Sequence, residues 1–211
     1  MFTKNYKNML AAFGMAYLNY SNSGITLKTR AGALRYALTK NPEYCYYPCG
    51  LYASTTFASG TSTSTYDQLR LDWACTAHGD SSNSQTRTGL IFSDTQGVTE
   101  DSYILPGTEF FPLSKFSIAI KSRTLTTTEN DTTFKIVYTL TSKVSTDVVI
   151  GSLGYYVKTY AATTRGGTSL AYGQYLMIAI DLDEPVTIPA SGAADLTVTI
   201  KANGQAWATV T

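Results

Sequence analysis

The sequence predicts a mainly β fold: an antiparallel β-sandwich of jelly-roll-like form, with a short N-terminal helix. The first observation is that apolar and polar residues alternate near the C-terminus, on both sides of a turn at residues 189–192. The apolar members are Leu176, Ile178, Ile180, Leu196, Val198 and Ile200. Such alternation indicates antiparallel strands with one face on a core. The second observation is that short alternating runs and turn residues recur through the second half.

Length and composition fit a single β domain. The chain has 211 residues, of which 44% are hydrophobic and only 15% charged, and sixteen are tyrosines. This length suffices for one sandwich with a full core. We therefore predict a single β-sandwich domain over residues 41–211. Residues 1–40 are expected to form an N-terminal helix and a basic docking extension.

The first eighteen residues have helical spacing. Their large apolar residues are Phe2, Tyr6, Met9, Leu10, Phe13 and Tyr17, and Thr3 or Asn5 would cap the helix that we predict over residues 4–18. Its apolar stripe would cover either an open end of its own sandwich or a neighbouring subunit. The apolar run over residues 9–18 is too short to span a bilayer, and no signal-peptide cleavage site follows it. We expect synthesis and folding in the cytoplasm.

Further strands are expected in order along the chain. Residues 25–29 should form a short strand, and residues 31–39 a turn of helix or a strand. Alternation predicts strands over residues 69–73, 89–92, 116–120, 134–140, 148–157, 176–188 and 196–200. Trp207 and Val210 would add one more strand at an edge. Exposed loops are expected over residues 124–133 and 161–173, because their Thr, Gly and charged residues offer little apolar area.

Charge is segregated along the chain. Residues 1–40 contain six basic residues and no acidic residue, whereas residues 41–113 contain two basic and eight acidic residues. Such segregation indicates docking on a partner of opposite charge, either another protein or another copy of this chain. The alternative is that the two regions lie side by side in one molecule and neutralise each other.

All three cysteines and the only histidine lie in two short segments: Cys45 with Cys49, and Cys75 with His78. Tetrahedral zinc needs four such ligands in two close pairs, so a structural zinc site is one interpretation. The pair spacing is loose, however, and reduced cysteines are often simply buried. We expect no cofactor and no metal here, with structural zinc as the alternative.

Three other features of the sequence bear on chemistry or binding. The carboxylates of Asp181, Asp183 and Glu184 could bind Ca²⁺ or simply be solvated at a strand end. No serine lies in a G-x-S-x-G motif, and no glycine-rich phosphate loop occurs. We therefore expect no enzyme activity, although distant carboxylate pairs of the glycosidase type stay open. A tyrosine-rich segment, Tyr44, Tyr46, Tyr47 and Tyr52, suits either sugar stacking or a subunit contact.

Three phrases of the second half follow one another in a distinctive order: FKIVYTLTSKVSTDVVI (134–150), GSLGYYV (151–157) and AIDLDEPVTIPASGAADLTVTI (179–200). Together they resemble a C-terminal β-sandwich block of tailed-bacteriophage virion proteins. In that block an alternating strand leads to an IGLY-like strand, and a D-x-x-x-P-V-T-L-x-x-G hairpin precedes the last strand. The resemblance covers residues 114–202 and consists of strand patterns rather than catalytic residues.

The resemblance implies a virion component, such as a head decoration protein, a head fibre base or a tail accessory protein. Such a protein would be made in the host cytoplasm and would pack against copies of itself and other virion proteins in the capsid, neck or tail. Neither a specific nucleic acid nor a membrane is expected as a partner. The alternative function is a carbohydrate-binding module for host attachment, with a host glycan as its ligand.

Overall fold

The structure is a computed structural model that describes residues 1–8, 11, 26–32, 34–36, 88–159 and 173–211. Within them the chain is mainly β, as the sequence predicts. A two-stranded ribbon contains β1 (Thr26–Lys28) and β2 (Leu34–Tyr36). The main sheet contains β3 (Thr88–Ser93), β4 (Glu109–Phe110), β5 (Phe116–Thr127), β6 (Thr132–Ser142), β7 (Val148–Thr159), β8 (Gly173–Ile188), β9 (Ala193–Lys201) and β10 (Ala206–Val210). A short helix, α3 (Pro112–Lys115), precedes β5.

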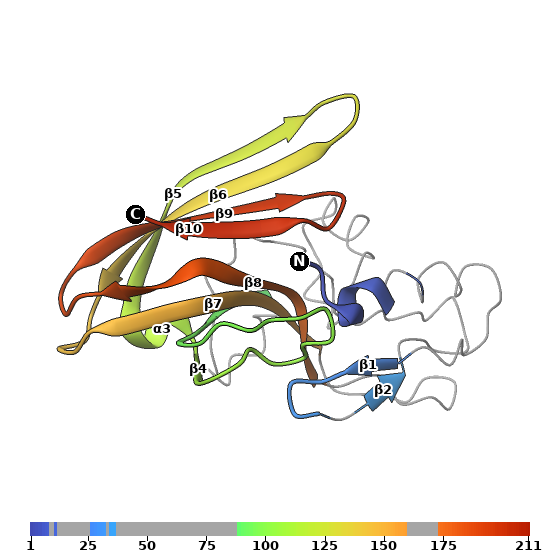
Figure 1. Cartoon of the computed structure of the whole chain (residues 1–211), viewed down its shortest axis with the longest axis horizontal. Helices are drawn as coiled ribbons and strands as arrows, with labels where there is room; N and C mark the ends of the chain where they lie inside the picture. Colours follow the sequence, from blue (N-terminus) through green and yellow to red (C-terminus); the bar gives the residue numbers. More distant parts are fainter. Residues whose placement is uncertain (9–10, 12–25, 33, 37–87, 160–172) are drawn as a thin grey trace, which may run out of the picture.

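The main sheet is one curled sheet and not the pair of sheets that a sandwich would have. Its eight strands are hydrogen-bonded in the order β4-β3-β7-β8-β10-β9-β6-β5. Strand β8 joins the two halves, because it pairs with β7 along most of its length and with β10 through Leu182 and Ala208. Strands β5, β6, β9 and β10 then lie over β7 and β8 (Figure 1). The β8–β10 pair is parallel, and the other described pairs are antiparallel.

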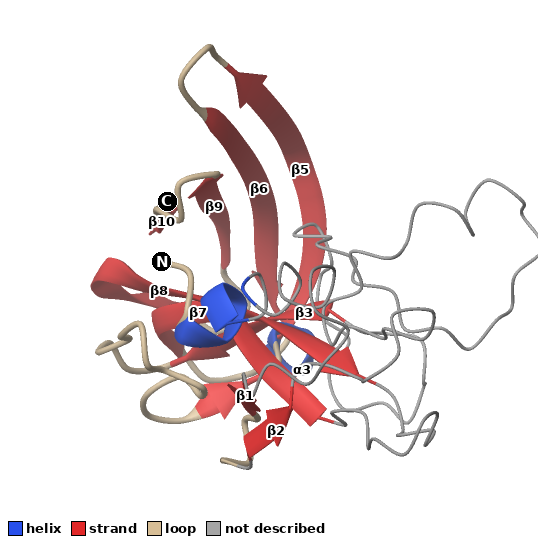
Figure 2. Ribbon diagram, turned by 90° about the vertical axis from the view of Figure 1, so that its right-hand side faces the viewer, coloured by secondary structure: helices blue, strands red, loops and turns tan. Residues whose placement is uncertain are grey.

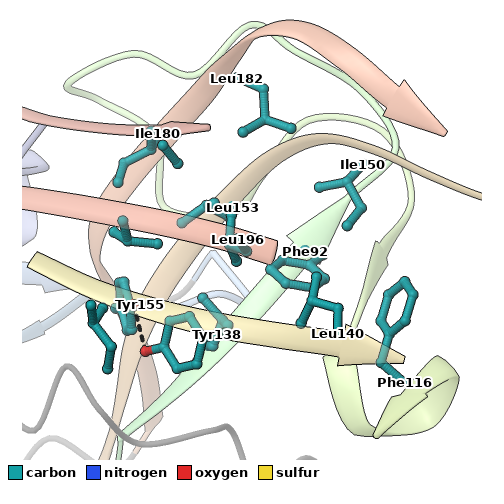
Figure 3. Packing of buried hydrophobic residues seen from close by; sticks show 14 of the residues in the cluster. Phe92, Phe116, Tyr138, Leu140, Ile150, Leu153, Tyr155, Ile180, Leu182 and Leu196 are labelled. Atoms are coloured by element: carbon teal, nitrogen blue, oxygen red, sulfur yellow. Dashed lines mark hydrogen bonds between the residues drawn. The ribbon is translucent and has the colours of Figure 1, made fainter. Parts of the chain in front are cut away.

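The core fills the space between the two halves of the curled sheet (Figure 3). Its fully buried large side chains come from both halves and include Phe92, Phe116, Ile136, Tyr138, Leu153, Tyr155 and Leu196. They alternate with outward-facing residues along each strand, which explains the period-two pattern of the sequence. Each such side chain contributes about 1.5–3 kcal/mol of burial free energy. The core therefore depends on strands from both halves, which holds the curled shape closed.

The predicted loop over residues 124–133 is mostly strand. Residues 124–127 belong to β5 and pair with residues 132–135 of β6, so that the turn contains only residues 128–131. The amide of Thr128 closes this turn by donating to the carbonyl of Asp131 (2.8 Å). The loop prediction was wrong because threonine is β-branched and favours strands when a partner strand is present. These residues are largely exposed, and the hairpin reaches beyond the β9–β10 turn (Figure 2).

Two other predictions are refined. The last strand, β10, contains Trp207 and Val210 as expected, but it lies between β8 and β9 rather than at an edge. Residues 34–36, for which a helical turn or a strand was predicted, form strand β2. The predicted strand over residues 69–73 and the loop over residues 161–172 lie outside the described residues.

The predicted N-terminal helix is present at residues 4–8. Thr3 caps it, since its hydroxyl oxygen accepts from the amide of Tyr6 (3.5 Å) and the carbonyl of Thr3 accepts from the amide of Lys7 (3.2 Å). Residues 9–10 and 12–18 of the predicted helix lie outside the described part of the chain.

Candidate functional site

The four residues of the predicted zinc alternative, Cys45, Cys49, Cys75 and His78, lie outside the described residues. The tyrosine-rich segment with Tyr44, Tyr46, Tyr47 and Tyr52 also lies there. Among the residues that the structure does describe, no group of three or more His, Cys, Asp or Glu side chains is placed to hold a metal ion. The zinc alternative therefore stays a prediction.

The three acidic residues of β8, Asp181, Asp183 and Glu184, lie in two different environments. Both carboxylate oxygens of Asp181 accept from the backbone amides of Gly97 and Val98, at 3.1–3.3 Å. Asp181 therefore fixes the loop that follows β3 against β8. Asp183 and Glu184 are exposed to solvent. The predicted Ca²⁺ set is thus not assembled as one cluster among the described side chains.

The N-terminal residues attach to β8 of the same chain. Met1 and Thr3 flank an antiparallel bridge between Phe2 and Ile178: the carbonyl of Met1 accepts from the amide of Ala179, and the amide of Thr3 donates to the carbonyl of Met177. The Thr3 hydroxyl, which is buried, donates to the carbonyl of Leu176 (2.7 Å). Phe2 packs against the core at this end. The start of the chain therefore lies along the stretch of β8 that precedes its contact with β10, within the same molecule.

The basic and acidic segments pair within the molecule. Lys4 contacts Asp101 (3.4 Å), and Lys7 contacts Glu100 (2.6 Å), both at exposed positions. Arg30 forms a largely buried ion pair with Glu109. For these three cations, the intramolecular alternative for the charge segregation is the one that the structure supports. The expected docking role of residues 1–40 is not tested by these contacts and stays a prediction.

The outer face of the half-sheet β5-β6-β9-β10 is rich in hydroxyl groups. The strand registers place on this face Ser122 and Thr124 of β5, Thr133, Thr139 and Thr141 of β6, Thr197 and Thr199 of β9, and Thr209 of β10. Lys121 forms an ion pair here with Asp195, which also accepts from the Thr139 hydroxyl (2.8 Å). These two contacts hold the pKa of the Asp195 carboxyl below its usual value, Lys121 having the larger effect. One large aromatic side chain, Trp207, lies on the same face.

Strand β5 is an edge of the main sheet. Among the described strands it is hydrogen-bonded to β6 alone, and its outer half, residues 121–127, is exposed on both faces. Leu125, on the inner face opposite Phe134, has 68% of its surface exposed. A strand edge with an exposed leucine is a surface on which another chain can pair and bury apolar area.

Sequence reasoning missed both of these surfaces. Leu125 was interpreted as part of a loop, although it is the one large apolar residue in a run of threonines. Trp207 was interpreted only as part of a terminal strand, although its two neighbours, Ala206 and Ala208, are the residues that fit an inward-facing position. The A-W-A alternation, in which the two small alanines face the core, is therefore the sequence signal that Trp207 faces outward.

Two further findings bear on the class of protein. No helix among the described residues is both long and apolar enough to cross a bilayer. Comparison with protein-family models, with curated proteins and with solved structures finds no match for this chain.

Proposed function

We propose that this protein is a structural component of a bacteriophage particle and acts through contacts with copies of itself and with other virion proteins. The proposal starts from the strand patterns of residues 114–202, which resemble the β-block of such proteins. Nothing in the proposal requires a catalytic site, a cofactor, a nucleic acid or a membrane. It places the protein in the virion after synthesis in the host cytoplasm.

The observation that carries the proposal is that β5, which carries the exposed Leu125, pairs with β6 alone among the described strands. Natural sheets usually shorten or cover their edge strands, because an exposed edge pairs readily with other chains. Here the edge strand has 12 residues, and its outer half is exposed on both faces. A protein that works by assembly has a use for such an edge, because a neighbouring chain can extend the sheet and cover the leucine.

The charges of β5 indicate what kind of strand could pair with its edge. The strand contains two cations, Lys121 and Arg123, and no acid. Lys121 is paired with Asp195, but in a symmetric antiparallel pair of two β5 strands centred on Arg123 the arginines of the two copies would lie close together and repel each other. The edge therefore suits an uncharged or acidic extended segment of a different element better than the same strand of a second copy.

The test is incorporation into particles purified from the phage that encodes the chain. The wild-type chain should be found in a fixed number of copies by quantitative mass spectrometry and as density at symmetry-related positions. The variant Leu125→Asp should fold but be lost from particles, because the charge would be buried by the neighbour. The matched control is Leu34→Asp on β2, since Leu34 is 63% exposed and lies outside the main sheet.

Absence of the wild-type chain from purified particles would overturn the proposal. Equal incorporation of both variants would keep the virion assignment but remove the β5 edge as the contact. The carbohydrate-binding alternative stays a prediction as well. The sequence-based argument for this alternative used the tyrosine-rich segment, which lies outside the described residues. Binding of the whole chain to an array of glycans tests this alternative.

A further inference from the structure

Trp207 exposes a large aromatic surface at a position where nearby residues are polar. It lies on β10 opposite Thr199 of β9, while its neighbours Ala206 and Ala208 face inward and pack with the core. Its side chain is 44% exposed. An indole combines a wide apolar face with one N–H donor, and such side chains are usually buried or used for binding.

The groups around Trp207 are hydroxyls on one side and carboxylates on the other. Thr197 and Thr199 lie on β9, and Thr209 follows on β10. On the other side, Ala208 pairs with Leu182 of β8, and both pack in the core. The flanking acids Asp181 and Asp183 therefore point to the same outer face as Trp207. Asp181 is engaged by two backbone amides, and Asp183 is exposed.

This combination fits a sugar better than a protein. A protein interface needs several apolar anchors around its centre. Across β6, β9 and β10 the outward-facing side chains with a large apolar surface are Trp207 and the half-buried Val137, and the rest are mainly threonines and charged residues. A hexose ring has an apolar C–H face that stacks on an indole, and it has hydroxyls around its edge that exchange hydrogen bonds with threonine and carboxylate oxygens.

The charges favour a neutral sugar. Asp183 is an exposed carboxylate at the β8 border of this face. A carboxylated or sulfated sugar placed on Trp207 would be repelled by this carboxylate, whereas the hydroxyls of a neutral sugar can donate to it. Of the outward-facing lysines nearby, Lys201 is paired with Asp131 (2.9 Å), and Lys135 lies one strand further away, on β6. A β-sheet is also nearly flat over the width of one ring, so the site needs no pocket.

We propose that the outer face of β10 centred on Trp207 is a binding site for a neutral carbohydrate. Trp207 stacks on the ring, and Thr197, Thr209 and Asp183 exchange hydrogen bonds with its hydroxyls. The site is distinct from the β5 edge, and the inference stands or falls independently of the proposed assembly function.

The experiment is a titration of the full chain, labelled with ¹⁵N, with three neutral oligosaccharide series and one acidic series. The probes are oligomers of glucose, of galactose and of N-acetylglucosamine, with oligogalacturonate as the acidic comparison. The chain has two tryptophans, so the indole N–H signal of Trp207 is assigned as the one that Trp207→Phe removes. At least one neutral series should shift this signal saturably, together with amides of β9 and β10, and oligogalacturonate should not.

Variants give the second readout. Trp207→Ala should weaken binding by at least about tenfold, as expected for the anchor of a small interface, and Trp207→Phe should retain part of the affinity. Val149→Ala is the control, because Val149 is 39% exposed on β7 and should leave binding unchanged. Each variant is first checked for cooperative unfolding. Because the shift map of the wild-type chain does not depend on Trp207→Ala, the inference stays testable even if that variant does not fold.

Three outcomes would overturn the inference. The first is that none of the neutral series shifts the Trp207 signal. The second is that a series binds but the shifted amides lie away from β9 and β10, or Trp207→Ala binds as well as the wild type. The third is that no sugar binds and Trp207→Ala changes the oligomeric state in solution, which would mean that a second copy of the chain covers this face.

Discussion

The hydroxyl groups of Tyr138 and Tyr155 meet in the core, 2.9 Å apart, although their strands are not neighbours in the sheet (Figure 3). Tyr138 lies on β6 and Tyr155 on β7, and both side chains are fully buried. The curled sheet brings the two strands face to face, so this hydrogen bond links its two halves. A buried hydroxyl needs such a partner, because leaving it unpaired costs more than the bond itself contributes.

We predict that Tyr138→Phe and Tyr155→Phe each lower the free energy of unfolding by about 1–3 kcal/mol, since each leaves the other hydroxyl without this partner. The double variant should lose less than the sum of the two single losses, because the second substitution removes the hydroxyl that has lost this bond. Denaturant unfolding of the four proteins provides the double-mutant cycle. Strict additivity of the two losses would show that the hydroxyl pair does not couple the two halves.

The N-terminal residues contribute to folding, given their contacts with β8. Phe2 packs on the core, its ring lies 4.1 Å from that of Tyr6, and its amide donates to the carbonyl of Gly204 (3.2 Å). We predict that deletion of residues 1–8 lowers the free energy of unfolding by at least about 3 kcal/mol, and that Phe2→Ala accounts for about 2 kcal/mol of this. The double variant Lys4→Ala with Lys7→Ala should cost only about 1 kcal/mol or less per pair.

Such a loss would mean that the first residues belong to the folded core and are not only part of the docking extension that the sequence predicts for residues 1–40. Thermal melting followed by circular dichroism separates the two cases. A truncated chain that melts at the wild-type temperature would restore the view of residues 1–18 as an assembly element alone.

The sequence predicted the strands well because burial on one face leaves a local signal. Leu196, Val198 and Ile200 alternate in the chain because all three face the same core. The joining of the strands into one sheet leaves no such signal, because it depends on β8 being long enough to pair with both β7 and β10. The place of β10 between β8 and β9 is likewise a non-local property.

Gly151 shows the same contrast between local features, which the sequence reveals, and non-local contacts, which it does not. The sequence marks Gly151 as an interruption of a strand, and the structure supplies the reason. A Cβ atom at this position would lie 2.7 Å from the carbonyl carbon of Thr95, where the loop after β3 crosses β7 at a break in the register with β8. The sequence could reveal the glycine but not the segment that passes over it.

The ion pair of Arg30 and Glu109 joins the β1–β2 ribbon to the main sheet. Both side chains are largely buried, and the second carboxylate oxygen of Glu109 accepts from the amide of Leu105 (2.8 Å). Arg30 also lies 5.7 Å from the ring centre of Phe111 and 5.6 Å from that of Tyr156. The arginine is thus held by a carboxylate and by two aromatic rings at once.

We predict that Glu109→Ala lowers the free energy of unfolding by about 3 kcal/mol, because it leaves a buried guanidinium without its carboxylate. Glu100→Ala, which breaks the exposed pair with Lys7, is the control and should cost about 1 kcal/mol or less. The two variants differ by the burial of the pair they break. Similar losses measured by urea unfolding would mean that the Arg30 pair behaves as a surface pair.

The final prediction concerns acid. Asp94, in the loop after β3, accepts from the amide of Thr108 (2.9 Å) and from the hydroxyl of Thr95 (2.8 Å). These bonds lower the pKa of the Asp94 carboxyl below its ordinary value of 3.8, the amide of Thr108 being the larger cause. The folded chain therefore binds this proton less readily than the unfolded chain does. The carboxylate thus stabilises the fold above pH 3.8, and this contribution is lost as the pH falls through the folded pKa.

We predict that Asp94→Ala lowers the free energy of unfolding at neutral pH, and that its difference from the wild type shrinks as the pH falls below about 4. Asp94→Asn keeps an acceptor oxygen but cannot titrate. Its difference from Asp94→Ala should therefore stay constant with pH, while both variants lose the same part of the wild-type acid dependence. Urea unfolding at a series of pH values measures these differences. If the gap between wild type and Asp94→Ala stays the same from neutral pH to a pH of about 2, the loop contacts stabilise the fold without regard to the charge of Asp94, and the assigned cause of the pKa shift is wrong.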